Sequence, residues 1–137
     1  MAETVRSVDY FYATVDSVPG QARRLLEFCS AHEVNLINFT AFPIGLGRAQ
    51  LDFFPENTQK LIKAAGDAGI PLVGPKKAFL VQGEDRPGVL VEYHLRLADA
   101  GVNVYAANGT TDGRGGFGYI LWVKPEDYEK AAEALGI

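Results

Sequence analysis

The residues Glu84–Asn103 read EDRPGVLVEYHLRLADAGVN, and they decide the fold that we predict for this chain. An apolar segment, Ala78–Gln82, precedes them and is typical of a buried strand. Pro87 suits the first turn of a helix, where its fixed φ fits and its missing N–H costs nothing. Asp85 stands just before it, where a short acidic side chain can cap free N–H groups. We therefore expect a helix over residues 87–100.

The second half of this stretch predicts how that helix packs and how it ends. Tyr93 and Leu97 recur at helical spacing, so one face of the helix is buried. Gly101 can end the helix in a left-handed conformation. A new strand, Val102–Ala107, then follows. The stretch is predicted to form a strand, a loop, a helix and a second strand, with the helix N-terminus facing outward beyond the loop.

The same pattern occurs earlier in the chain, at a constant offset of 68 residues. Gly20 corresponds to Gly88 and Asn35 to Asn103, and both pairs follow the same kind of strand and helix. A repeat of this length is a small domain and not a solenoid unit. The chain is therefore predicted to contain two copies of one fold.

Each copy is predicted to follow the ferredoxin-like order βαββαβ, which makes the fold class α+β. The first repeat is assigned to residues 1–75 and the second to residues 76–137, where the last strand is missing or very short. We expect one antiparallel sheet of seven or eight strands, with the helices packed on one face. The missing strand would leave the apolar edge of Lys77–Gln82 open. A second chain or the lead Glu3–Ser7 should cover that edge, and a homodimer is the favoured solution.

Composition limits the classes of function. The 137 residues are 47% hydrophobic and carry a net charge of −4, with a pI near 5.1. No basic stripe is present to neutralise phosphates, so a nucleic-acid partner is not expected. The single cysteine, Cys29, is expected in the core. No apolar run is long enough to span a membrane, and a cytoplasmic location is the default expectation.

The loop Asp85–Gly88, the helix after it, and the segment Ala100–Val104 resemble the ACT domain. Members of that family couple the binding of small molecules, usually amino acids, to the regulation of metabolic enzymes. The second repeat matches the pattern closely. The first matches at Gly20 and Asn35 but has Glu33 where a glycine is expected. The resemblance covers nearly the whole chain as a tandem, stand-alone protein.

The resemblance also implies a ligand site where the strand–helix loop of one domain meets the second strand of its neighbour. In the second repeat it assigns Asp85, Arg86, Pro87, Gly88, Val89, Leu90, Asn103 and Val104 to that site. In the first repeat it assigns Asp16, Ser17, Val18, Gly20, Asn35 and Leu36. A ligand carboxylate would take the N–H groups of residues 88–90, and Asp85 would pair with an ammonium group. The alternative is that the aspartates only cap helices and the asparagines only fix turns.

The glycine-rich segment and the two histidines indicate no phosphate-binding or metal site. The glycine-rich segment Asp112–Gly118 leads into a strand and lacks the lysine of a phosphate loop, so a hairpin is expected. His32 and His94 have no cluster at metal spacing and are expected on helix surfaces, without metal or cofactor.

Three functions remain open. The leading one is a regulatory module that binds an amino acid without catalysis, as a homodimer and with a metabolic enzyme as a further partner. The second is a docking module of the same fold without a ligand. The third is a small acylphosphatase-like enzyme, because the residues 81–83 followed by Arg86 distantly resemble the phosphate loop of those enzymes. The asparagine that would position water is missing from residues 117–123.

Overall fold

The computed structural model describes residues 3–137, which form two compact units. One unit comprises residues 9–76. The other comprises residues 77–137 together with the first residues of the chain, up to Val8. We call these the first-repeat unit and the second-repeat unit. The predicted boundaries, 1–75 and 76–137, differ from this grouping because the N-terminal lead packs with the second repeat; residues 1 and 2 lie outside the described part.

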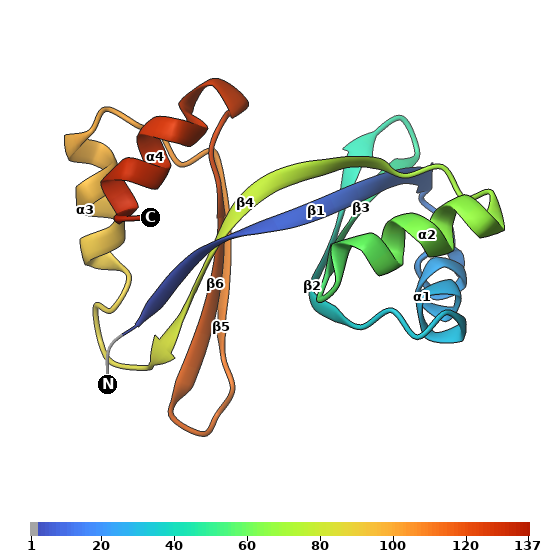
Figure 1. Ribbon diagram of the computed structural model, residues 1–137, viewed down its shortest axis with the longest axis horizontal. Coiled ribbons are helices and arrows are strands. Elements are labelled where there is room, and N and C mark those ends of the chain that lie inside the picture. The colour runs from blue at the N-terminus through green and yellow to red at the C-terminus, as the bar shows by residue number, and fades with distance from the viewer. Residues whose placement is uncertain (1–2) are drawn as a thin grey trace. The chain divides into compact units, whose positions relative to one another are not determined.

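The first-repeat unit has the predicted βαββαβ order (Figure 1). Its elements are β1 (Thr4–Asp16, from Asp9 onward), α1 (Gln21–Ala31), β2 (Leu36–Gly45), β3 (Arg48–Pro55), α2 (Thr58–Ala68) and the first residues of β4 (Val73–Glu84). β3 lies between β2 and β1 and pairs antiparallel with both. Both helices cover one face of these strands, as predicted (Figure 1).

Alternation along the strands creates the core of this unit. Phe11, Leu51 and Phe53 point to the helical face and are almost fully buried against Leu25 and Leu61. Burial of side chains of this size stabilises a fold by roughly 1.5–3 kcal/mol each. The helices are thereby fixed above the sheet, and the loops between helices and strands gather at its ends.

The second-repeat unit repeats this architecture. It contains β4 from Lys77 onward, α3 (Val91–Asp99), β5 (Ala106–Thr111), β6 (Gly116–Trp122), a short 3-10 turn at Pro125–Asp127, and α4 (Tyr128–Leu135). β6 pairs antiparallel with both β4 and β5. Phe79, Val81, Leu97 and Leu121 form its core beneath α3 and α4.

The start of β1 supplies the strand that the second repeat lacks. β1 neighbours β4 in the sheet, so the open edge of β4 is covered by the lead and not by a second chain. Tyr93 donates a hydrogen bond from its hydroxyl to Glu3 Oε1 at 3.1 Å, and Tyr128 donates to Ser7 Oγ at 2.7 Å. Two ways to cover this edge were predicted, and the structure shows the lead there and not a homodimer.

Two predicted boundaries in the second repeat are wrong. α3 begins at Val91 and not at Pro87, because Gly88 has a φ of 77°, which lies outside the right-handed helical region. Residues 102–105 are irregular, and β5 begins at Ala106. The last strand predicted for the first repeat and the strand predicted at residues 77–82 are one continuous strand, β4. The described residues therefore form six strands and not seven or eight.

Within residues 3–137, no helix combines the length and the apolar character that a membrane span requires.

Candidate functional site

The loop before α3 is a closed turn. The Val89 N–H donates to the Arg86 carbonyl at 3.2 Å, and the Val91 N–H donates to the Gly88 carbonyl at 3.0 Å. The Val89 N–H is therefore already used, so the prediction that residues 88–90 all offer free N–H groups to a carboxylate is wrong at its central residue. The N–H groups left open by the helix start belong to its first turn, which begins at the N-cap residue Leu90.

The two aspartates of the strand–helix loops do not cap helices. The Asp85 backbone N–H donates to Gly115 O at 2.8 Å, while Asp16 pairs with Arg48 at 2.6 Å between carboxylate and guanidinium. Neither α1 nor α3 has a side-chain cap at its N-terminus. The capping alternative is thus wrong for both residues. In the structure, these loops are tied to the hairpins of their own repeats.

The first-repeat loop shows the same attachment. The Ser17 N–H donates to Gly47 O at 2.7 Å, and the Val18 N–H donates to Asp16 O at 2.9 Å. Gly20, with a φ of 94°, precedes α1 as Gly88 precedes α3. Both loops therefore have the left-handed glycine that lets the chain turn sharply into its helix.

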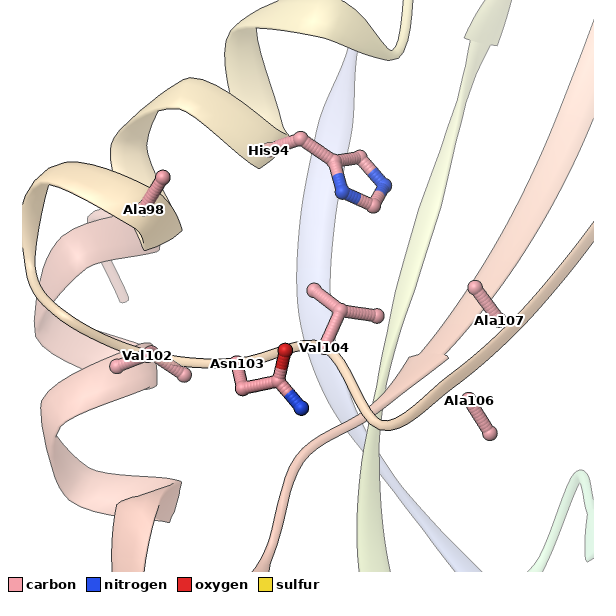
Figure 2. A pocket seen from close by; sticks show the side chains of 7 residues that line it. All are labelled: His94, Ala98, Val102, Asn103, Val104, Ala106 and Ala107. Atoms are coloured by element: carbon pink, nitrogen blue, oxygen red, sulfur yellow. The ribbon is translucent and has the colours of Figure 1, made fainter.

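A groove of about 490 Å³ opens in the second-repeat unit between α3 and the segment that leads into β5. We call it the second-repeat groove. Its lining residues are His94, Ala98, Val102, Asn103, Val104, Ala106 and Ala107. Figure 2 shows the His94 ring projecting from α3 above Val104, with the Asn103 amide on the loop below. This volume falls in the range of small-molecule sites.

The first-repeat unit has a groove of about 430 Å³ at the equivalent place, which we call the first-repeat groove. Its lining residues are Leu26, Cys29, Ser30, Glu33, Val34, Asn35 and Leu36. Five of these positions correspond to residues of the second-repeat groove at the offset of 68. The recurrence shows that the groove is a property of the repeat and not an accident of one surface.

The predicted site residues separate into two groups within each unit. Asn103 and Val104 line the second-repeat groove, and Asn35 and Leu36 line the first-repeat groove. The loop residues 85–90 lie at the other end of α3, whose nine residues span roughly 14 Å. One unit by itself does not bring the loop and the groove together.

The two groove asparagines are in different states. Asn35 Nδ2 donates to Glu56 Oε2 at 3.1 Å, and the Glu56 N–H donates back to Asn35 O at 2.9 Å. The residue equivalent to Glu56 in the second repeat is Lys124, which cannot accept a hydrogen bond. Among residues 3–137, the Asn103 side chain has no hydrogen-bond partner and is exposed to solvent in the groove. The interpretation of the asparagine as a turn-fixing residue fits Asn35 but not the Asn103 side chain.

The second-repeat groove contains a contact that the sequence analysis missed. His94 Nε2 lies 2.6 Å from the hydroxyl of Tyr119, which is buried beneath it on β6. Burial raises the pKa of the Tyr119 phenol, so this hydroxyl keeps its proton. The sequence did contain a sign of this contact. The equivalents of His94 and Tyr119 in the first repeat are both apolar, Leu26 and Leu51, so the two residues differ from the repeat together.

The glycine-rich segment forms a hairpin, as predicted. Asp112 Oδ1 accepts hydrogen bonds from the N–H groups of Arg114 at 2.6 Å and Gly116 at 3.0 Å. These two bonds lower the pKa of the Asp112 carboxyl. The carboxylate thus organises the turn itself.

Comparison with known proteins identifies the fold. No model of a protein family matches the chain, and no curated protein matches it in sequence. Among solved structures, a protein of Bacteroides thetaiotaomicron is similar with a TM-score of 0.79 and 14% identity, over 96% of this chain and 88% of that one.

Two similar structures are regulatory subunits of aspartate kinase. That of Thermus thermophilus, in its ligand-free form, has a TM-score of 0.65 and 16% identity, with 97% and 93% of the two chains covered. That of Thermus flavus has a TM-score of 0.64 and 15% identity, with 98% and 95% covered. These likenesses confirm the tandem ACT-like fold, and the two Thermus proteins among them are regulatory subunits.

Proposed function

We propose that this protein is a non-catalytic regulatory module of the cytoplasm that binds a small ligand, an amino acid, at its ACT-like repeats. The observation that carries the proposal is the groove that recurs in both repeats, each time beside the asparagine at the start of the second strand. The regulatory character of the neighbouring structures supports it. A metabolic enzyme is the partner class that this function implies.

An amino acid suits the chemistry of the second-repeat groove. The groove offers an amide at Asn103 and an imidazole at His94, surrounded by small apolar side chains. An amide can both donate to a carboxylate and accept from an ammonium group. The loop residues 85–90 would complete the site from a neighbouring copy. The proposed site therefore needs two copies, one that supplies the groove and one that supplies the loop.

A second copy of the chain is the neighbour that we propose. β2 and β5 are the outermost strands, and every residue of β5 is exposed. Such an edge offers unpaired backbone groups to another strand. Pairing of second strands is also what the ACT resemblance implies.

The proposal is tested by isothermal calorimetry of the full chain against each of the twenty amino acids. Replacing Asn103 by alanine should weaken the binding of that amino acid by about 1–3 kcal/mol, because its polar groups lose their hydrogen-bond partner. This is cleaner than a substitution at Gly88, whose φ of 77° would strain any other residue. If no amino acid binds, or if N103A binds as well as wild type, the proposed site is wrong.

One observation favours the docking module as the second candidate. The β2–β3 hairpin exposes Phe42, Ile44 and Leu46, the last completely. Clustered exposed apolar side chains mark interaction surfaces. If the amino-acid screen is negative and I44D/L46D abolishes co-purification of a partner enzyme, this function replaces the first.

The acylphosphatase-like alternative gains no support. Arg86, the residue that suggested it, faces Glu3 at 3.6 Å between guanidinium and carboxylate.

A further inference from the structure

The second-repeat groove and the first-repeat groove share their position and backbone, but they differ in chemistry. In the first repeat, Leu26 occupies the helix position, and Leu51, at the position equivalent to Tyr119, belongs to the apolar core. In the second repeat, His94 occupies that position and is hydrogen-bonded to the hydroxyl of Tyr119. Both polar residues of the pair are absent from the first repeat, where Leu26 and Leu51 stand.

The hydrogen bond to Tyr119 sets the role of each imidazole nitrogen. The contact fits a protonated phenol that donates to Nε2, and with this direction the proton of the ring lies on Nδ1. The His94 ring projects into the groove (Figure 2), so its second nitrogen is available to a molecule bound there. In that tautomer, the His94 Nδ1–H is a donor of fixed direction.

A second donor stands on the opposite wall. The Asn103 amide is free among the described residues, whereas its counterpart Asn35 is held by Glu56. The second-repeat groove therefore has two unused hydrogen-bond donors, one from α3 and one from the segment before β5. The first-repeat groove has an apolar helix position and an occupied amide.

We propose that the two grooves are functionally different, and that the second-repeat groove alone binds the ligand through a carboxylate held between His94 Nδ1 and Asn103 Nδ2. Tyr119 is a positioning residue that acts through His94. This inference rests on the proposed function and deepens it, since it names the repeat, the ligand group and the residue that determines specificity. The first-repeat groove has the equivalent position but does not bind the carboxylate.

The test uses the full chain and two kinds of probe: the twenty amino acids, and succinate as a carboxylate without an ammonium group. Calorimetry compares wild type with H94L, which introduces the residue of the first repeat, and with H94Q, which keeps a donor. We expect H94L to weaken the strongest binder at least tenfold and H94Q to restore part of the affinity. H32L is the matched control, because it makes the same change at the other histidine, which lines neither groove, and it should leave the affinity within twofold of wild type. N35A tests whether the first-repeat groove binds the ligand instead.

The positioning role of Tyr119 has its own readout. The chain has only two histidines, and His32 bonds its own helix through Nδ1, so it serves as an internal reference in ¹⁵N spectra of the imidazoles. Wild type should show the His94 Nδ1–H tautomer, and Y119F should shift that signal towards the Nε2–H tautomer without moving that of His32. An unchanged His94 spectrum in Y119F would overturn the positioning role.

The outcomes separate the two claims. If the affinity for an amino acid falls in N35A but not in H94L, this inference is overturned and the proposed function stays intact. Succinate binding that shifts His94, without any amino-acid binding, supports the groove and overturns the amino-acid function. If no probe binds, both claims are wrong.

Discussion

At the scale of single residues, Asp52 is the most unusual side chain. The residue is only 3% exposed, and burial raises the pKa of its carboxyl above the ordinary 3.8. The hydrogen bond from Gln50 and the charge of Lys76 lower this pKa and partly offset the effect of burial. Because the pKa is raised in the folded state, its contribution to stability is fully present below pH 3.8. The contribution is lost as the pH rises through the folded-state pKa.

We therefore expect Asp52→Asn to stabilise the protein at pH 7 and to have little effect near pH 3.5. The amide keeps an oxygen that accepts from Gln50 Nε2 and removes the cost of a buried charge. Urea unfolding at both pH values measures this difference. A less stable variant at pH 7 would mean that the attraction of Lys76 outweighs desolvation.

Gly83 is required by the close approach of the lead. A Cβ at this position would lie 2.7 Å from Glu3 Cγ and 3.0 Å from Glu3 Cα, so the backbone would have to move. We expect Gly83→Ala to cost about 1–3 kcal/mol of unfolding free energy, as overpacking does. Gly118→Ala is the matched control, because its Cβ would meet nothing within 4 Å. Equal unfolding midpoints for the two variants would contradict this account.

At the scale of elements, the order of strands and helices along the chain could be predicted, because it follows from the hydrophobic period and from the repeat. Leu25, Cys29, Tyr93 and Leu97 are buried as their spacing indicates. The start of α3 could not be predicted, because Pro87 favours a helix start while the left-handed Gly88 delays it to Val91. The start of β5 was missed because its residues, AANGTT, are all exposed and carry no apolar alternation.

The candidate site could be predicted less completely than the fold. Asn35 and Asn103 follow from the motif, but their different partners depend on residues about twenty positions away, Glu56 and Lys124. The bond between His94 and Tyr119 joins two elements that no local pattern connects. A comparison of the two repeats position by position would have identified both differences.

The lead strand offers a test at this scale. Removing residues 1–7 should expose the edge of β4, destabilise the second-repeat unit and promote association through Ala78–Val81. Amide exchange should accelerate in β4 and α3 while β2 and β3 stay protected. Unchanged protection in β4 would show that the lead does not complete this unit.

At the scale of the whole molecule, the outer strands decide assembly. If two chains pair through β5, then N108K/T110K should dissociate the dimer, since charges on an edge strand oppose pairing. Sedimentation equilibrium measures the association constant, and we expect at least a tenfold loss. The same pair of lysines placed on the helix surface, as L95K/D99K, is the control. A wild-type chain that stays monomeric at high concentration would remove this part of the proposal.

The assignment of residues 3–8 to the second-repeat unit has a consequence for biosynthesis. A ribosome makes these residues before the rest of either repeat, yet the strand that they complete needs β4, β6 and the helices that follow Lys77. The first-repeat unit is whole once residue 76 has left the exit tunnel, whereas the second-repeat unit waits for residues 77–137. During that interval, residues 3–8 have no strand to pair with, and the two repeats, although alike in fold, mature in a fixed order.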